Sequence, residues 1–296
     1  MNTRIIGAEY DYLCPHSLGE ALDILAGREG VKVLAGGTDL LVKLKTNGLA
    51  DLKYMLDIKQ VAELDFIRED EAGRLHIGPL VKLSRLEKEP LVLERYPALA
   101  AAIRLMAAVS VRNMGTMAGN ICNASPVADS VIPAICYEAQ VILASQARGQ
   151  RAVALEDFFL APGVSVLAQD ELLADIVLPQ PQVHTGAAFI KKTRVRPDIA
   201  KISICVKLVR SGARVRDCRI ALGAVAARPY FAQAQSQALL GQKMSEGLIA
   251  EIAAALAAEI RPIDDNRTTA EYRIALAEAI TADALKSAWQ QAGGEL

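Results

Sequence analysis

Hydrophobic positions in the N-terminal part of the chain predict a helix followed by a small unit of alternating strands and helices. The first helix is expected to begin at Ser17, which forms a capping box with Glu20 ahead of apolar residues at helical spacing. Next come a short buried strand over 31–35, a helix over 40–45 and a strand over 54–58. This order predicts a βαβ unit with parallel strands.

The middle of the chain predicts antiparallel strands and several helices. Apolar runs on either side of the acidic turn 69–73 are typical of a hairpin. A second capping box, Ser84 with Glu87, is expected to open a short helix, and Pro97 a longer one to about Val109. The remaining pattern predicts a helix over 130–137 and strands over 64–68, 75–78, 140–145, 151–154 and 171–178.

The Pro-Gln-Pro-Gln segment 179–182 is expected to be a linker between two parts of the chain. Apolar and polar residues alternate over 202–208, which predicts a strand in a sheet with two distinct faces. Strand-like runs cover 187–193, 201–210 and 214–226, and Ala- and Leu-rich helices are expected near 231–241, 246–260 and 269–292. The whole pattern predicts an α+β protein.

Composition and charge exclude several function classes. The formal net charge of −1 argues against a nucleic-acid-binding protein, which normally carries a basic surplus. The length of 296 residues excludes none of these classes but suggests about two domains. No apolar run approaches the ~18 residues of a membrane span, and Met1–Arg4 leads into no signal peptide. We therefore expect a cytoplasmic protein without a membrane span.

Cysteine and histidine positions give no sign of a metal centre. The chain has five cysteines and no CxxC pair, so neither a disulfide framework nor a thiolate-held zinc or iron–sulfur site is expected. His16, His76 and His184 lie far apart in sequence and are expected to be structural or surface residues. We therefore predict no metal ligands in this chain.

The glycine pair Gly36-Gly37 lies in a loop between a predicted strand and a predicted helix. Adjacent glycines permit positive φ and let a ligand approach the backbone. Successive N–H groups at a helix start form a concave anion site. The alternative interpretation is an ordinary tight turn.

Residues 110–130 show little periodicity and are expected to form a long functional loop. The stretch 111–129 offers backbone N–H groups, three Asn amides, two hydroxyls and a carboxylate, which suit a cofactor with phosphate and ribose groups. Arg112 and Asp129 are equally compatible with a structural ion pair that pins the loop. The GxGxxG and P-loop patterns are missing, so a Rossmann or Walker-type nucleotide site is not supported.

Together these segments resemble the medium, FAD-binding subunit of the xanthine dehydrogenase and carbon monoxide dehydrogenase family, the molybdenum hydroxylases. The resemblance covers nearly the whole chain. It rests on Cys14–Leu22, Ala35–Asp39, Arg112–Thr116 and Ala124–Asp129, and in the C-terminal part on Phe189, Lys191, Arg194, Asp198, Ala200, Asp264, Asn266, Arg267, Tyr272 and Arg273.

The resemblance implies a fold of two domains. An FAD-binding domain would span 1–178, with subdomains of about 1–58 and 59–178: the small βαβ unit, then a mixed or antiparallel sheet with helices. A C-terminal medium-subunit domain over 183–296 would hold a three-stranded antiparallel sheet and a helical bundle.

The resemblance also implies which residues bind FAD. A first cradle for the diphosphate would comprise Lys32, Val33, Leu34, Ala35, Gly36, Gly37, Thr38 and Asp39. A second would comprise Thr116, Met117, Ala118, Gly119 and Asn120, with the Thr116 hydroxyl on phosphate, and Ser125 nearby. Asp129 would accept hydrogen bonds from a sugar or adenine group. Leu172 or Leu173 would pack on the cofactor, and Phe189 or Lys191 would lie near the isoalloxazine ring.

Two positions depart from the family pattern. Ala118 stands where many relatives have glycine, and its methyl group crowds a place of tight backbone approach. Met106 stands where some relatives carry an aromatic residue beside the flavin, so methionine would offer a soft apolar surface without stacking.

By the same resemblance the chain would carry no catalytic residue of its own. A [2Fe-2S] small subunit would pass electrons to its FAD, a molybdopterin-containing large subunit would hydroxylate the substrate, and NAD or another acceptor would receive the electrons. The expected assembly is a dimer of heterotrimers. The alternatives are a self-sufficient flavoenzyme with its own substrate pocket, and a flavin-free scaffold subunit.

Overall fold

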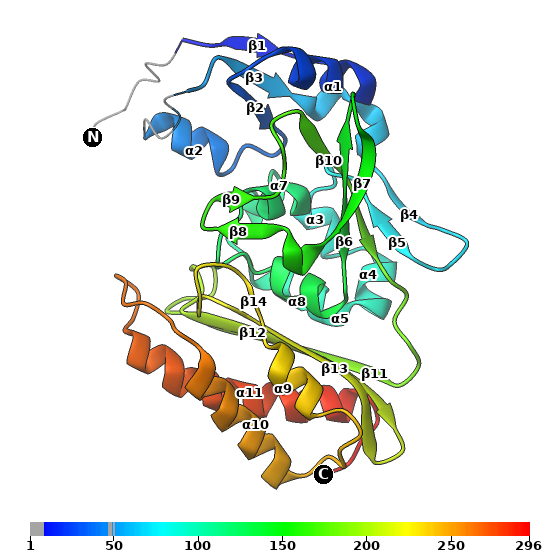
Figure 1. Cartoon of the computed structure of the whole chain (residues 1–296), viewed down its shortest axis with the longest axis vertical. Helices are drawn as coiled ribbons and strands as arrows, with labels where there is room; N and C mark the ends of the chain where they lie inside the picture. Colours follow the sequence, from blue (N-terminus) through cyan, green and yellow to red (C-terminus); the bar gives the residue numbers. More distant parts are fainter. Residues whose placement is uncertain (1–8, 47–48, 50) are drawn as a thin grey trace.

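The computed structural model describes residues 9–46, 49 and 51–296, so the expectation for Met1–Arg4 lies outside the described residues. Three groups of helices and strands follow one another along the long axis of the molecule (Figure 1). A small parallel sheet lies at one end, a five-stranded sheet with helices in the middle, and a four-stranded sheet with the C-terminal helices at the other end. No helix in these ranges is both long and apolar enough to cross a membrane.

The N-terminal unit contains the predicted parallel strands. β2 (Val31–Leu34) and β3 (Tyr54–Asp57) pair in parallel and are joined through α2 (Leu40–Lys45), which confirms the βαβ prediction. β1 (Asp11–Leu13) adds a third strand beside β3 that the sequence pattern missed, because three residues are too few to show a period. Before α1 (Leu18–Gly27), the Ser17 side chain accepts a hydrogen bond from the Glu20 N–H at 3.1 Å, as predicted.

The middle sheet is antiparallel throughout, with the strand order β4-β5-β10-β6-β7. Its central strand, β10, is buried along its whole length because helices and the small unit cover it. The strands are β4 (Ile67–Glu69), β5 (Leu75–Ile77), β6 (Gln140–Ser145), β7 (Gly149–Ala154) and β10 (Glu171–Leu178). The other elements are α4 (Pro90–Arg95), α8 (Val131–Cys136), a hairpin of β8 (Phe159–Ala161) and β9 (Val164–Ser165), and 3₁₀ helices over Ile58–Gln60, Ala62–Leu64 and Leu155–Asp157.

Three predictions for this region were wrong. α3 (Leu83–Leu86) begins after Lys82, so Ser84 lies inside the helix and does not cap it. α5 (Pro97–Leu105) ends before Val109, because Met106 is extended and Ala107 has φ +41°. The segment expected to be a loop, 110–130, contains the end of α6 (Val109–Arg112) and all of α7 (Met117–Cys122). α6 has only four residues, and α7 contains Gly119 and Asn120, so neither segment shows a clear run of apolar residues at helical spacing.

The C-terminal sheet has four antiparallel strands where three were expected. β11 (Thr185–Lys192), β12 (Ile202–Ser211) and β13 (Arg214–Gly223) match the three predicted runs, and the two-residue β14 (Tyr230–Phe231) completes the sheet. α9 (Gln233–Ala238), α10 (Glu246–Glu259) and α11 (Ala270–Gln291) follow, close to the predicted bounds. The helices pack on the face that carries Ile202, Ile204, Val206 and Leu208.

The opposite face of this sheet is buried as well. Cys205 belongs to the core of the middle part of the molecule, and Lys207 pairs with Glu138 across the boundary at 2.7 Å. The alternation therefore marks two different buried faces: one is apolar, and the other mixes small, thiol and charged side chains. This contact places β11 beside the cavity described next.

Candidate functional site

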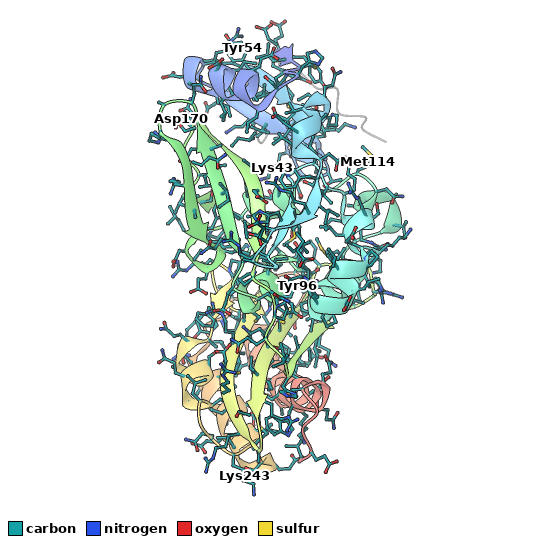
Figure 2. The ribbon with its side chains drawn as sticks, turned by 90° about the vertical axis from the view of Figure 1, so that its right-hand side faces the viewer. Lys43, Tyr54, Tyr96, Met114, Asp170 and Lys243 are labelled. Atoms are coloured by element: carbon teal, nitrogen blue, oxygen red, sulfur yellow. The ribbon has the colours of Figure 1, made fainter. Side chains whose placement is uncertain are left out.

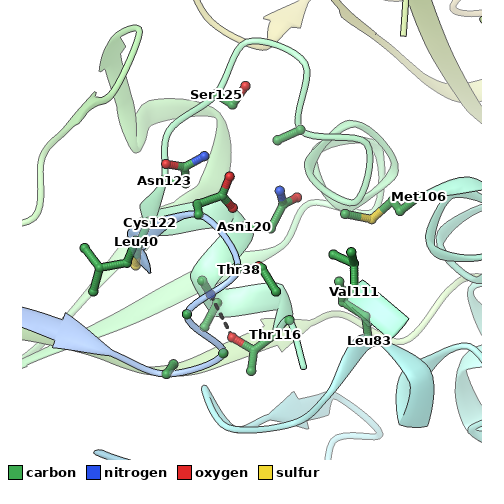
Figure 3. A pocket seen from close by; sticks show the side chains of 18 of the residues that line it. Thr38, Leu40, Leu83, Met106, Val111, Thr116, Asn120, Cys122, Asn123 and Ser125 are labelled. Carbon is green, nitrogen blue, oxygen red and sulfur yellow. Dashed lines mark hydrogen bonds between the residues drawn. The ribbon is translucent and has the colours of Figure 1, made fainter. Parts of the chain in front are cut away.

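A cavity of about 520 Å³ lies where the small unit, the middle part and β11 meet. This volume falls within the usual range for small-molecule sites, ~300–1,000 Å³. Figure 2 shows Lys43 and Met114 at this level, between Tyr54 near one end and Tyr96 in the middle. In Figure 3, Thr38 of the small unit faces Thr116 and Asn120 of α7 and its cap, with Met106 farther along the wall.

The loop after β2 presents backbone donors to this cavity. The N–H groups of Gly36, Gly37, Thr38 and Asp39 donate to no residue that the structure describes. Gly37 has φ +76°, a conformation in which glycine escapes the penalty of a side chain. Since α2 and α7 are only six residues long, these N–H groups matter more here than any helix dipole. Four adjacent free donors form a cradle suited to an anion.

The segment 116–120 faces that cradle. The Thr116 hydroxyl oxygen accepts a hydrogen bond from the Gly119 N–H at 3.0 Å and so caps α7 (Figure 3). Asn120 Oδ1 accepts from the Ser130 hydroxyl at 2.8 Å, which leaves the amide N–H groups of Asn120 for a ligand. Thr116 is therefore a structural cap whose hydroxyl proton is still available to a phosphate.

Loss of this cap is expected to destabilise the chain measurably. Thr116→Val should lower the free energy of unfolding in urea by about 1 kcal/mol, because valine cannot accept the Gly119 N–H bond. Thr116→Ser keeps the oxygen and should behave like the parent protein. Equal stability of the valine and serine variants would show that the cap contributes nothing.

The postulated ion pair between Arg112 and Asp129 is wrong. Arg112 instead pairs with Glu87 at 2.8 Å and donates to the carbonyls of Met106 and Ala107 at 2.8 and 3.0 Å. These bonds hold the turn that follows α5 and forms part of the cavity wall. Asp129 pairs with Lys191 of β11 at 2.7 Å.

Asp129 is a buried carboxylate at the cavity wall. Burial raises its pKa, and the neighbouring Lys191 ammonium opposes that rise. Its Oδ1 atom is buried and receives no hydrogen bond from any described residue. A buried acceptor without a partner is costly, so this oxygen is suited to a ligand hydroxyl or amine.

All but three of the residues predicted to bind the cofactor line this cavity. Leu34 packs instead in the small core beneath α2, and Met117 and Phe189 pack in or against the core of the middle part. Their side chains point away because alternate residues of strands and successive residues of helices face different sides. Their predicted contact with the cofactor is therefore not supported.

The sequence analysis missed several residues of the cavity wall. Lys43 donates to Asn123 Oδ1 at 2.6 Å and so bridges the small unit and the end of α7. Lys43 lies four residues after Asp39, so helical spacing could have placed it on the cavity side of α2. Glu171, at the start of β10, is held by Arg151 through two bonds of 2.7 and 2.8 Å, a contact that no local pattern reveals.

Both halves of the chain match known families. Residues 8–181 match the family described as FAD binding domain in molybdopterin dehydrogenase, and residues 187–288 match the CO dehydrogenase flavoprotein C-terminal domain. The chain belongs to the FAD-binding medium subunits of xanthine and CO dehydrogenases. Its cofactor is FAD, and it is a subunit of a molybdenum hydroxylase-type oxidoreductase.

Individual relatives resemble this medium subunit from end to end. The xanthine dehydrogenase FAD-binding subunit of Escherichia coli O157:H7 is 30% identical over 97% of this chain and 99% of its own length. The carbon monoxide dehydrogenase medium chain of Hydrogenophaga pseudoflava is 33% identical over 96% and 99%.

Solved structures give the same result. A chain of the Hydrogenophaga pseudoflava enzyme lacking the Mo-pyranopterin moiety has a TM-score of 0.92 at 33% identity, covering 97% of this chain and 99% of its own. A chain of quinoline 2-oxidoreductase from Pseudomonas putida 86 has a TM-score of 0.89 at 29% identity, covering 96% and 98%.

The cavity fits the cofactor of this family on two independent features. The free N–H groups of 36–39 suit the diphosphate, and the unpartnered Oδ1 of Asp129 suits a hydroxyl of a sugar or ribityl group. Ala118 lines the cavity and is 3% exposed, so its methyl group is accommodated in the wall. Met106 lines the same cavity and provides an apolar sulfur-containing surface.

Proposed function

We propose that this medium subunit is an electron relay. It would take electrons from [2Fe-2S] clusters on a small subunit and pass them through FAD to NAD or another acceptor. A molybdopterin-containing large subunit would oxidise the substrate, and the complex would be a dimer of heterotrimers in the cytoplasm. The observation that carries this proposal is the cavity with four free backbone N–H groups, which belong to the residues that match the FAD-binding domain family.

We assign the binding roles from the geometry of the cavity. Two segments would hold the diphosphate: residues 32–39 except Leu34, and residues 116–120 except Met117. Lys43 lies at the contact between these two segments. Leu172 and Leu173 of β10 would pack on the cofactor. FAD, when bound, supplies the redox chemistry, and the chain binds it, orients it and shields it from water.

We also propose that 1–178 and 183–296 are the two domains. β10 ends at Leu178 and β11 begins at Thr185, so the boundary falls between two sheets. The C-terminal sheet and its helices share a core of their own.

The charged groups of the cavity support a binding role over an acid–base role. Two carboxylates are buried in its wall, and each forms an ion pair. Asp129 pairs with Lys191, and Glu171 pairs with Arg151. The Arg151 guanidinium keeps the pKa of Glu171 below its usual range, so this group stays an anion. A self-sufficient enzyme needs a group that can exchange a proton beside the flavin, whereas these two are held in place.

FAD is expected to be bound without a covalent link. Cys122 is the thiol of the cavity wall, and burial raises its pKa to about 12, so it stays protonated and unreactive. Acid precipitation of the purified yellow chain should therefore release the colour into solution. Colour that stays with the protein pellet would contradict this expectation.

The proposed function has a simpler test. A purified chain that neither carries FAD nor takes it up would overturn it.

A further inference from the structure

Arg273 is a buried arginine that lies outside the cavity. It belongs to the C-terminal residues on which the family resemblance rests, it lies near the start of α11, and it is only 3% exposed. Its Nη1 donates to the Ala224 carbonyl at 2.8 Å, and its Nη2 pairs with Asp265 Oδ1 at 2.7 Å. Asp265 has other donors, the backbone N–H groups of Arg267 and Thr268, whereas the Ala224 carbonyl receives no second donor in the described part of the chain. Ala224 is therefore the residue that depends on Arg273.

Ala224 follows β13 in a conformation that alanine rarely adopts. Its φ is +66°, in the left-handed region where a Cβ atom is strained. In this conformation its N–H donates to the Pro126 carbonyl at 3.0 Å. A strained conformation of this kind persists only where the surrounding contacts enforce it. Arg273 supplies one such contact, because it fixes the peptide group after Ala224 while Pro126 fixes the one before it.

Pro126 lies in the segment 124–129, which forms part of the cavity wall. Four residues of this segment line the cavity: Ser125, Val127, Ala128 and Asp129. The segment contains no helix or strand, so its position depends on bonds from other parts of the chain. Two backbone N–H groups reach it: Gly163 donates to the Ala124 carbonyl at 2.9 Å, and Ala224 donates to the Pro126 carbonyl. The bond from Ala224 therefore holds this part of the wall from outside the cavity.

We infer that Arg273 is a positioning residue: by holding Ala224 in its left-handed conformation, it keeps the segment 124–129 in place and so slows the release of bound FAD. The inference rests on the proposed function, which assigns the cavity to FAD. Without Arg273, Ala224 is free to relax to a negative φ, and its N–H then turns away from Pro126. The start of α11 thus stabilises the cavity wall although Arg273 does not line the cavity.

The test is the rate at which the FAD-loaded full-length chain releases its cofactor after dilution, followed by the rise in flavin fluorescence. Arg273→Met should release FAD about five- to tenfold faster than the parent, the effect expected from the loss of one net hydrogen bond. Methionine is also long and unbranched, so it fills part of the same space but cannot donate to the Ala224 carbonyl.

A second substitution separates positioning from general support of the fold. Glycine adopts positive φ as readily as negative φ, so Ala224→Gly removes the strain that Arg273 has to oppose. In Arg273→Met with Ala224→Gly, the bond to the Pro126 carbonyl should form again, and the release rate should return to within about twofold of the parent. Damage elsewhere in the C-terminal helices would not be rescued by this change. Ala224→Gly alone should release FAD no faster than the parent.

Arg210 provides a matched control near the other end of α11. It also donates to two backbone carbonyls, those of Gly212 and Ala292, at 2.8 and 2.9 Å. None of these three residues lines the cavity. Arg210→Met should therefore lower the thermal stability of the apo chain but leave the release rate within about twofold of the parent.

If Arg273→Met fails to fold, Arg273→Lys carries the same expectations. Lysine keeps a cation near Asp265, but its single ammonium group cannot reproduce the two-armed contact of the guanidinium. Thermal unfolding of each apo variant confirms that folded protein is compared.

Three results would overturn the inference. Release from the Arg273 variant at the rate of the parent would show that Arg273 does not act on the cavity wall. Equally fast release from Arg273→Met and Arg210→Met would assign Arg273 a merely structural role, and so would the absence of rescue by Ala224→Gly. If the parent chain itself binds no FAD, the proposed function fails first, and that outcome is distinguished because it needs no variant.

Discussion

Gly36→Ala is expected to weaken FAD binding at least about 100-fold, because several hydrogen bonds to a charged diphosphate would be lost together. A Cβ atom at Gly36 would overlap the Met114 carbonyl oxygen and crowd the Gly115 Cα atom. Both are backbone atoms, so the clash cannot be relieved by a side-chain rotation. The loop after β2 and the segment before α7 must separate, and the cradle of N–H groups then no longer faces Thr116. Titration of the apo variant with FAD measures the effect.

Gly27→Ala is the matched control for this variant. Gly27 ends α1, and a Cβ atom there would meet nothing within 4 Å. It should bind FAD like the parent. If Gly36→Ala also retained the affinity of the parent, the close approach of the two loops would have no role in cofactor binding.

Arg112→Met is expected to lower the free energy of unfolding by about 3–5 kcal/mol, the usual cost of breaking a buried ion pair by removing one partner. The side chains of Arg112 and Glu87 are only 9% and 12% exposed, so Glu87 would be left nearly buried without a cation. The carbonyls of Met106 and Ala107 would also lose their donor. Ala107 has φ +41°, a left-handed conformation that costs about 1–2 kcal/mol and that these bonds help to maintain. Urea unfolding without FAD measures the loss.

Arg85→Met serves as the comparison. The Arg85 side chain is 48% exposed and pairs at 3.1 Å with Asp65, which is 53% exposed, and exposed pairs contribute only about 0–1 kcal/mol. Similar losses in the two variants would contradict the importance assigned to the Arg112 bonds. The Arg112 variant should also bind FAD more weakly, because the turn at Met106 and Ala107 lines the cavity.

The parts of the fold that the sequence predicted are those with a local cause. Ser17 and Glu20 lie within one helical turn, and the cap between them is present in the structure. The glycine pair after β2 indicated a backbone cradle because its spacing is local. The strands β1 and β14 were missed because they have only three and two residues. The two helices in the segment 110–130 were missed because one has four residues and the other contains glycine and asparagine.

Contacts between distant residues could not be predicted. Asp129 and Lys191 are 62 positions apart, and Lys43 and Asn123 are 80 apart. The pattern offered Arg112 as a partner for Asp129 because the two lie in one segment, but Arg112 turns to Glu87 and the Met106 turn. The need for glycine at position 36 could not be predicted either, because the backbone of Met114 and Gly115, far away in the sequence, leaves no room for a Cβ atom there.

The most direct measurement of the central claim uses the flavin-loaded chain alone, free of detectable molybdenum and iron, under anaerobic conditions. The absorbance of the flavin is followed after addition of NADH, and separately after addition of candidate aldehydes and N-heterocycles. A relay subunit should exchange electrons with NADH or with an artificial dye. It should leave the flavin colour unchanged with each substrate until the iron–sulfur and molybdenum subunits are added. Prompt bleaching of the flavin by a substrate in the chain alone would contradict the account and identify a self-sufficient flavoenzyme.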